Sequence, residues 1–390
     1  MSKNIEFKNI SNWIKDIHDK NIYNCSVVVV SKNKEVIYTK TLGYKDSNKK
    51  IDVETNDLFR VYSMTKPVTA LAFLILCEKY NINLDEKVSK YLPSFKNMNY
   101  FEGSKITYTD ELTLHHLLSM QSGLTYGWED DFRDNLIKSI WEKYEKENLS
   151  TMDFANELAK VPLKFKPGKD WVYGLNLEVL AAIIEVVSKI KFEDFMQKNV
   201  FEPLNMRDSN FYIFDKKREV KVQINTCKNG YHKIAQDDNY KGHFQEVYKM
   251  SNCILGGSNL VTTALDYQKF LDVLIDGFVD GKQIISKNIL QLISKDVLDK
   301  RLEQFYWRYN DDYSYCYGGR VRIKNEIEPK TEIGEFGWEG ILGSFGMCDP
   351  KNKITVTLLH SSNPGFNTIN GEEFIKVLYD DLIENNLIKK

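Results

Sequence analysis

Ser63 and Lys66 are the two residues of this chain whose types and spacing point most directly to chemistry. They stand three positions apart, and residues with this spacing on a helix lie on one face, about 5–6 Å apart. A serine hydroxyl becomes a useful nucleophile when a base takes its proton. A buried lysine amine that is neutral for part of the time can be that base. The pair therefore predicts acyl transfer through a serine nucleophile.

Context separates this pair from other occurrences of the same pattern. The same pattern occurs three more times. Ser31–Lys34 ends a predicted strand, Ser47–Lys50 lies in a polar turn, and Ser188–Lys191 lies at the end of a predicted helix. Ser63 instead opens a helix, because Pro67 suits a first turn. The apolar run that follows predicts a buried helix over about 64–80. The N-terminus of this helix would favour negative charge on a serine alkoxide or an oxyanion.

Composition narrows the class of protein. The chain has 390 residues and a net charge of −2, which gives no indication of nucleic acid or of an anionic membrane as a partner. Its N-terminus has no apolar signal-peptide core, and its longest apolar runs are too short to span a membrane. We therefore expect a cytoplasmic protein. Six scattered cysteines predict buried free thiols, and the six histidines show no metal-ligand spacing, so we expect no metal and no cofactor.

Strand patterns begin and end the chain, and helical patterns fill its middle. We expect one domain over 1–390 of the α/β class, of α+β type. Its antiparallel sheet would come from both chain ends, about 20–62 and 310–390, with helices on its faces and a mainly helical lobe inserted over about 64–250. The predicted strands are 26–30, 35–39, 315–323, 332–338, 341–348 and 353–360. The predicted helices are 8–20, 64–80, 112–120, 128–150 (an exposed lid or insertion), 152–159, 176–189, 260–277 and 370–386.

The segment 59–67 resembles the nucleophile segment of the serine β-lactamase and penicillin-binding-protein superfamily, and most closely its class C β-lactamase-related group with the family VIII carboxylesterases. Further stretches agree in the family's order, at 114–124, 165–168, 201–204 and 256–257. The resemblance covers roughly 20–360. It implies a β-lactamase/DD-peptidase-like fold and a serine hydrolase.

The resemblance also implies roles for two further motifs. In the family's Tyr-x-Asn motif, Tyr173 matches the tyrosine that shares base duty with Lys66, whereas Leu175 takes the asparagine position and Asn176 comes one residue late. Where β-lactamases have Lys-Thr-Gly, this chain has 338–340, as Trp-Glu-Gly, which resembles the esterases.

The third motif has consequences for the substrate. Trp338 removes the cation that binds a substrate carboxylate, Glu339 adds a negative charge unless it points away, and Gly340 would leave room for substrate along the strand. The backbone N–H groups of Ser63 and Ile341 are the inferred oxyanion hole. Aromatic side chains could wall an acyl pocket, namely Tyr126, Trp128, Trp307, Tyr315 and Tyr317.

Two rival signals are weak. Ser344 lies in a Gly-x-Ser-x-Gly-like stretch that lacks its first glycine, and His360 has no acidic partner for a Ser-His-Asp triad. We therefore expect a serine hydrolase that forms an acyl-enzyme on Ser63 and cleaves small or apolar esters or amides. The alternatives are a D-amino-acid peptidase or weak β-lactamase, an acyltransferase, and a non-catalytic binding protein with the same fold. The oligomeric state stays open.

Overall fold

The computed structural model describes residues 6–46, 50–228, 231–236, 240–298, 312–326, 331–365 and 371–389. A seven-stranded antiparallel sheet forms its centre, with the strand order β11-β12-β13-β14-β15-β1-β2. Two of these strands come from the N-terminal part, β1 (Cys25–Lys32) and β2 (Glu35–Gly43). The other five come from the C-terminal part: β11 (Tyr313–Cys316), β12 (Gly319–Arg322), β13 (Phe336–Glu339), β14 (Phe345–Asp349) and β15 (Ile354–Leu359).

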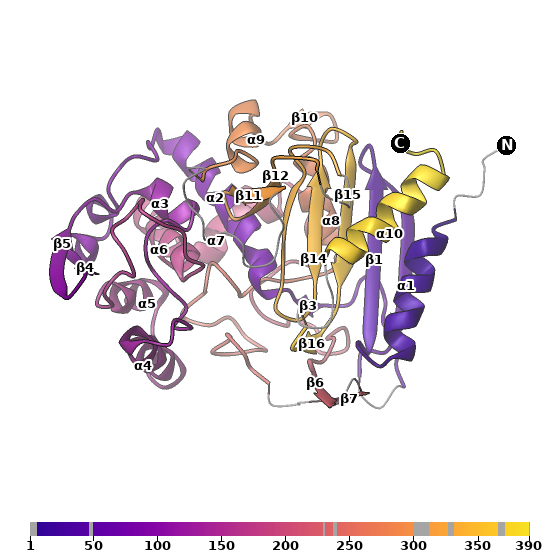
Figure 1. Ribbon diagram of the computed structural model, residues 1–390, viewed down its shortest axis with the longest axis horizontal. Helices are drawn as coiled ribbons and strands as arrows, with labels where there is room; N and C mark the ends of the chain where they lie inside the picture. Colours follow the sequence, from indigo (N-terminus) through magenta and orange to yellow (C-terminus); the bar gives the residue numbers. More distant parts are fainter. Residues whose placement is uncertain are drawn as a thin grey trace.

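Strand β1 joins the two halves of the sheet because it pairs with β15, with Val28 opposite Leu358. Its four consecutive valines are all buried, as expected for a central strand that is covered on both faces. On one face, Val28 and Val30 pack with the terminal helices α1 (Lys8–Asp19) and α10 (Gly371–Glu384). Figure 1 shows these two helices side by side on the right of the molecule.

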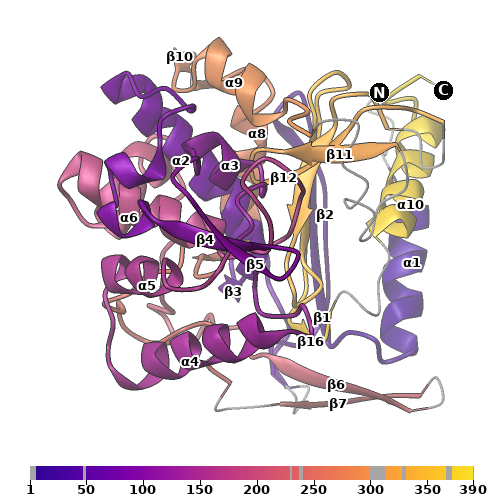
Figure 2. The same ribbon diagram turned by 60° about the vertical axis from the view of Figure 1, so that its left-hand side comes forward.

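The opposite face of the sheet packs against α8 (Ala264–Val273) and, beyond it, a lobe of helices. Figures 1 and 2 show this lobe on the left, away from α1 and α10. Helix α2 (Thr65–Tyr80) lies between the sheet and the lobe, and it contacts both β13 and α6. The other helices are α3 (Leu114–Leu118), α4 (Phe132–Lys146), α5 (Thr151–Leu158), α6 (Asn176–Ser188), α7 (Phe192–Met196) and α9 (Lys287–Ile293).

Short two-stranded pairings complete the fold. Strand β3 (Phe59–Arg60) pairs with β8 (Val261–Thr262) just before the Ser63 segment. The other short strands are β4 (Met98–Glu102) with β5 (Lys105–Thr109), β6 (Gln223–Lys228) with β7 (Tyr231–Gln236) and β16 (Ser362–Asn363), and β9 (Phe278–Val279) with β10 (Lys282–Gln283).

The predicted α+β architecture is confirmed, and several predicted elements differ in detail. The single strand predicted at 315–323 is a hairpin, β11 and β12, because Gly318 turns the chain at φ +88°. The helix predicted from 260 begins at Ala264, where the Thr263 side chain accepts a hydrogen bond from the N–H of Asp266. The hairpins β4–β5 and β6–β7 were not predicted within the helical lobe. The predicted exposed helix at 128–150 is α4, which buries one face through Ile137, Ile140 and Tyr144.

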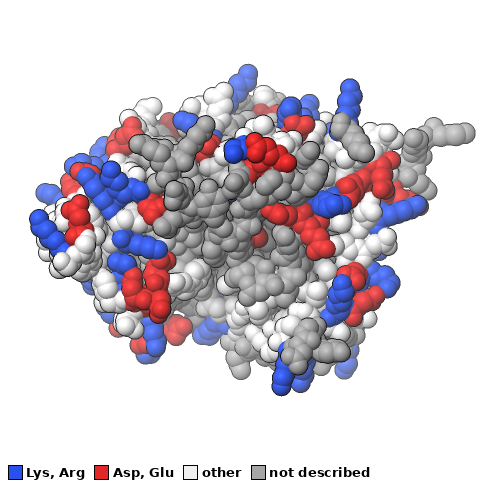
Figure 3. Space-filling view, viewed as in Figure 1, with Lys and Arg blue, Asp and Glu red and all other residues white. Residues whose placement is uncertain are grey.

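Cysteines and charges add little to the fold. All six cysteines lie in the described part and are free; Cys227 is exposed and the other five are buried. Within the described ranges, no helix combines the length and apolarity that a membrane crossing needs. Basic and acidic side chains are interspersed over the coloured part of the face shown in Figure 3.

Candidate active site

Ser63 lies in a tight turn between the sheet and a buried helix. A 3₁₀ turn covers Tyr62–Met64, and α2 follows directly from Thr65. The predicted helix start is therefore confirmed to within two residues, with Pro67 in the first turn. Tyr62 adopts a left-handed backbone conformation, φ +46°, which is uncommon for a bulky residue and costs roughly 1–3 kcal/mol. The packed surroundings of Tyr62 hold this strained turn, so the turn presents the Ser63 side chain in a fixed orientation.

Lys66 lies one turn further along and is fully buried. Its Nζ atom is 3.1 Å from Ser63 Oγ, 2.8 Å from the Tyr126 hydroxyl and 2.9 Å from the Gly257 carbonyl oxygen. Three partners match the three N–H donors of an ammonium group. In the neutral amine, two N–H groups bond to Tyr126 and Gly257, and the lone pair is left for the Ser63 proton. The geometry therefore allows the base role that the spacing predicted.

Two tyrosine rings enclose the same amine. The Lys66 Nζ atom lies 4.7 Å from the centre of the Tyr173 ring and 5.2 Å from that of Tyr126, within the range of cation–π attraction. The Tyr173 hydroxyl accepts a 3.1 Å hydrogen bond from the Trp338 indole N–H. The structure thus brings Ser63, Lys66, Tyr173 and Trp338 together from segments far apart in the sequence.

Gly340 and Ile341 follow strand β13 and lie against the nucleophile segment. A Cβ atom on Gly340 would collide with the carbonyl oxygen of Val61, so the glycine allows the two backbones to approach. We predicted that Gly340 leaves room for substrate; the space beside its Cα is instead filled by the chain that leads to Ser63. This contact brings Ile341 to the pocket that Ser63 lines, where the sequence placed the oxyanion hole.

The pocket at Ser63 has walls that are mainly aromatic. It contains about 440 Å³ of space outside atoms, part of it open to solvent. Its lining residues are Tyr62, Ser63, Tyr126, Trp128, Tyr173, His243, Trp338, Glu339, Gly340 and Ile341. None of these described lining residues is Lys or Arg, and the half-buried Glu339 is the acidic one. Such a pocket suits an uncharged, apolar group better than a carboxylate.

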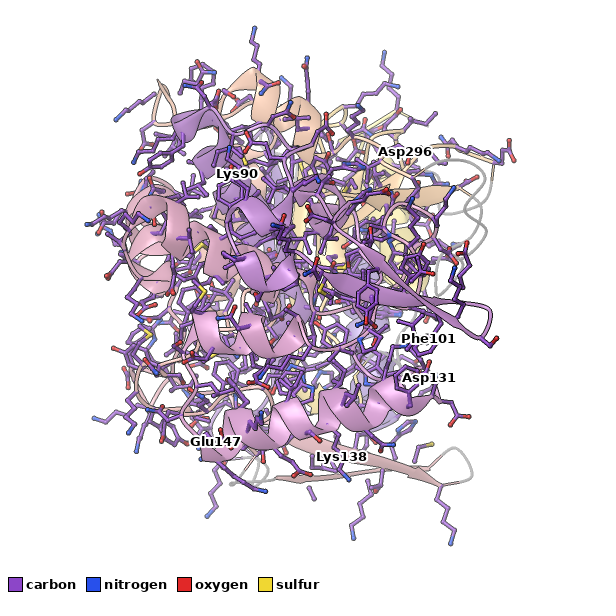
Figure 4. All side chains as sticks on the ribbon, turned by 90° about the vertical axis from the view of Figure 1, so that its left-hand side faces the viewer. Lys90, Phe101, Asp131, Lys138, Glu147 and Asp296 are labelled. Carbon is purple, nitrogen blue, oxygen red and sulfur yellow. The ribbon has the colours of Figure 1, made fainter. Side chains whose placement is uncertain are left out.

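Trp128 lines this pocket and precedes α4, which contacts the β4–β5 hairpin. Trp128 stacks on Tyr126 with ring centres 4.7 Å apart, and it is 59% exposed. Phe132, at the start of α4, meets Phe101 of the hairpin at 5.4 Å. Figure 4 shows Phe101 near Asp131, the residue that precedes α4. These contacts hold the hairpin against α4.

Burial sets the protonation of the side chains around Lys66. Burial and, to a smaller extent, the charge of Lys66 together lower the pKa of His243 to about 4, so this histidine is neutral at neutral pH. Burial also raises the pKa of Tyr126 well above its ordinary value, with a second contribution from Glu178. Burial raises the pKa of the Glu178 carboxyl, and the charge of Lys66 opposes this rise.

Other candidate residues lie outside the pocket. Asn176 is buried and binds Ser122 and the Met120 sulfur, so it holds the 120–124 segment instead of facing the pocket. Ser344 exchanges hydrogen bonds with the backbone of His360, and the His360 ring binds the Cys25 carbonyl oxygen. Burial lowers the pKa of His360 to about 3, so both residues have structural roles.

The remaining Ser-x-x-Lys matches show no such pairing in the described residues. Ser31 binds Asp272, whereas Lys34 binds Asp276. Ser188 donates to the carbonyl oxygen of Ile184. Ser47 and Trp307 lie outside the described residues.

Three residues near Ser63 and Lys66 were not predicted from the sequence: Tyr62, Glu178 and His243. Tyr62 carried a usable signal, because it directly precedes the nucleophile. His243 comes from a loop whose sequence has no distinctive pattern. Glu178 follows the displaced Asn176 on an otherwise apolar helix, and an acidic residue in that run could have indicated a buried charge.

Comparisons with known proteins agree with this fold. Residues 10–377 match the family described as Beta-lactamase, so the chain belongs to this family of serine hydrolases. Esterase EstB of Burkholderia gladioli is 31% identical over 202 residues, 50% of this chain and 48% of EstB. The match thus spans about half the length of that relative. A carboxylate methylbutanoyltransferase of Penicillium citrinum that acts on ML-236A is 27% identical, over 73% of this chain and 68% of the relative.

A solved structure shows the same fold. The hydrolase EstCE1, described as having promiscuous acyltransferase activity, superimposes with a TM-score of 0.80 at 22% identity, over 95% of this chain and 98% of EstCE1. The relatives therefore include esterases and acyltransferases of the penicillin-binding-protein-like group.

Proposed function

We propose that this protein is an esterase that cleaves small or apolar uncharged esters through an acyl-enzyme on Ser63. The observation that carries the proposal is the 3.1 Å contact between Lys66 Nζ and Ser63 Oγ in a pocket lined by aromatic side chains. The likeness to Esterase EstB supports it.

The steps follow from the contacts of Lys66. The neutral amine takes the Ser63 proton, and Ser63 Oγ attacks the ester carbonyl. The N–H groups of Ser63 and Ile341 stabilise the oxyanion. The departing alkoxide then takes a proton from Lys66, with the Tyr173 hydroxyl beside it. Water then attacks the acyl-enzyme while Lys66 takes its proton, and Ser63 Oγ leaves and receives that proton, which restores the free serine.

The lining residues argue for uncharged substrates over β-lactams and D-amino-acid peptides, which carry a carboxylate. Trp338 occupies the place of the family's carboxylate-binding lysine, and Glu339 beside it would repel an anion. At about 4 Å and the effective dielectric near a protein surface, two like charges cost a few kcal/mol. Weak β-lactamase or peptidase activity is thus the less favoured alternative, and intact Ser63, Lys66 and Tyr173 disfavour a purely binding role.

Acyl transfer to an alcohol is a second candidate, because the same acyl-enzyme serves it. The aromatic pocket favours an apolar acceptor over water near the acyl group, and the methylbutanoyltransferase and EstCE1 are relatives with such activity in their descriptions. Addition of a small alcohol during ester cleavage would show a transesterified product if this candidate holds.

A substrate panel tests the proposal. We expect p-nitrophenyl esters of short and medium acyl chains to be cleaved much faster than nitrocefin, and Ser63→Ala to abolish ester cleavage. Rapid nitrocefin turnover with negligible ester cleavage would reverse this assignment.

A further inference from the structure

Glu178 is a buried carboxyl group next to the proposed active site that the mechanism above does not use. It lies in the first turn of α6 and is 1% exposed. Within the described part of the chain, neither carboxyl oxygen has a hydrogen-bond partner at normal geometry. Burying a carboxyl group without such a partner is costly, so a compensating interaction is expected.

Lys66 supplies the largest such interaction across Gly257, and the backbone N–H groups of Glu178 and Gly257 add smaller ones. A Cβ atom placed on Gly257 would collide with Glu178 Oε1 and would stand 3.1 Å from Lys66 Nζ. Both groups therefore face the same point of the backbone, from α6 on one side and α2 on the other. Lys66 is also bound to the Gly257 carbonyl oxygen at 2.9 Å. Because Gly257 has no side chain, nothing at this position separates the carboxyl from the amine, and their charges can interact.

The other groups that face this pair in the described structure are held in their neutral forms. Burial raises the pKa of Tyr126, of Tyr144 on α4 and of Cys253, and Glu178 contributes to each rise. Burial lowers the pKa of His243. The Tyr173 ring lies 4.7 Å from the amine. Lys66 and Glu178 remain as the pair at the centre of this cluster that can carry opposite charges, because the charge of Lys66 opposes the rise that burial causes in the pKa of Glu178.

We propose that Glu178 is a positioning residue that serves as the buried counter-charge of Lys66 and so sets the pH above which Lys66 can deprotonate Ser63; this rests on the proposed function. A carboxylate near an ammonium group stabilises the protonated form. After Ser63 attacks, the same carboxylate stabilises the proton that Lys66 has just received, until the leaving group takes it.

The test is the pH dependence of Ser63 labelling by a fluorophosphonate in Glu178→Gln, which removes the charge and keeps the size of the side chain. In the wild type, the labelling rate should fall on the acid side as Lys66 becomes protonated. In the variant, we expect this acid limb to move to lower pH by about 1–3 units. A one-unit shift means about tenfold faster labelling at a pH on the limb.

Glu185→Gln is the matched control, because Glu185 lies on the same helix and its carboxylate accepts a hydrogen bond from the N–H of Phe192. Its acid limb should coincide with that of the wild type. An unchanged limb in Glu178→Gln, or loss of labelling at every pH in a folded protein, would overturn the proposal. If wild-type Ser63 were not labelled at all, the proposed function would fail instead.

A second measurement keeps the proposal testable if Glu178→Gln does not fold. In Lys66→Met, the carboxyl loses its counter-charge and should become protonated near neutral pH. We expect an infrared band of a protonated carboxylic acid that the wild type lacks. Its absence, or its presence in both proteins, would contradict the pairing.

Discussion

Tyr126→Phe tests whether the hydroxyl group of Tyr126 orients the amine of Lys66. The substitution removes the 2.8 Å hydrogen bond to Lys66 Nζ. It keeps the ring that stacks on Trp128 at 4.7 Å and meets Tyr173 at 5.3 Å. The pocket wall therefore stays in place, and the substitution removes one of the two contacts, those with Tyr126 and Gly257, that orient the amine towards Ser63.

A hydrogen bond to a charged group contributes about 1.5–3 kcal/mol. If that energy holds the amine in its productive orientation, its loss slows the acylation of Ser63 by roughly 10- to 150-fold. The assay is the second-order rate of fluorophosphonate labelling, followed by intact mass, together with kcat/KM for a p-nitrophenyl ester. Both values should fall together, because the change affects formation of the acyl-enzyme.

Tyr144→Phe is the matched control. Its hydroxyl is also buried and donates a 2.8 Å bond to the His243 carbonyl oxygen, yet none of its described contacts is with Lys66. We expect a loss of about 1 kcal/mol in the free energy of unfolding and a labelling rate within about threefold of the wild type. Equal labelling rates for Tyr126→Phe and the wild type would refute the reasoning that Tyr126 orients the base.

Two further predictions concern stability and pH. Gly340→Ala places a methyl group against the Val61 carbonyl oxygen, and we expect it to lower both the melting temperature and the ester activity by displacing the Ser63 segment. Gly371→Ala is the control and should retain activity, because its Cβ would meet only ordinary contacts, from 3.6 Å. Equal activities in the two variants would contradict this prediction. Burial lowers the pKa of His116 to about 4, and the neutral ring accepts a hydrogen bond from the N–H of Thr113. The contribution of this neutral histidine to the free energy of unfolding is therefore fully present above about pH 6.5 and is lost as the pH falls towards 4. His116→Gln keeps an acceptor in the capping box. Between pH 7 and pH 4.5, chemical denaturation should show that the free energy of unfolding falls by about 1–2 kcal/mol less in this variant than in the wild type, a figure reduced because His116 is partly exposed. Identical pH slopes of the free energy of unfolding in the two proteins would contradict this prediction.

The sequence predicted the parts of the site that depend on local patterns. Ser63 and Lys66 follow from helical spacing and an apolar run, and Tyr173 and Trp338 follow from the family resemblance. Their roles in catalysis stay predictions. The structure adds that Ser63, Tyr173 and Trp338 line one pocket and that the buried Lys66 contacts Ser63. This arrangement depends on the pairing of β13 with β14 and on the packing of α2 against α6.

Contacts between distant segments could not be read from the sequence. The Tyr126 hydroxyl reaches Lys66 because the chain after α3 returns to α2, and Glu178 faces the same amine across Gly257, which has no side chain. The strand predicted at 315–323 became a hairpin because Gly318 packs its turn against Lys66 and Ala70 of α2. Periodicity within one segment does not report such tertiary contacts.

Fluorophosphonate labelling with intact-mass spectrometry and peptide mapping tests the central claim most directly. We expect a single adduct on Ser63 in the wild type and none in Ser63→Ala. Ser188→Ala should be labelled like the wild type, because Ser188 donates its hydroxyl to the backbone of its own helix. An unlabelled wild type, or an adduct that persists in Ser63→Ala, would contradict it.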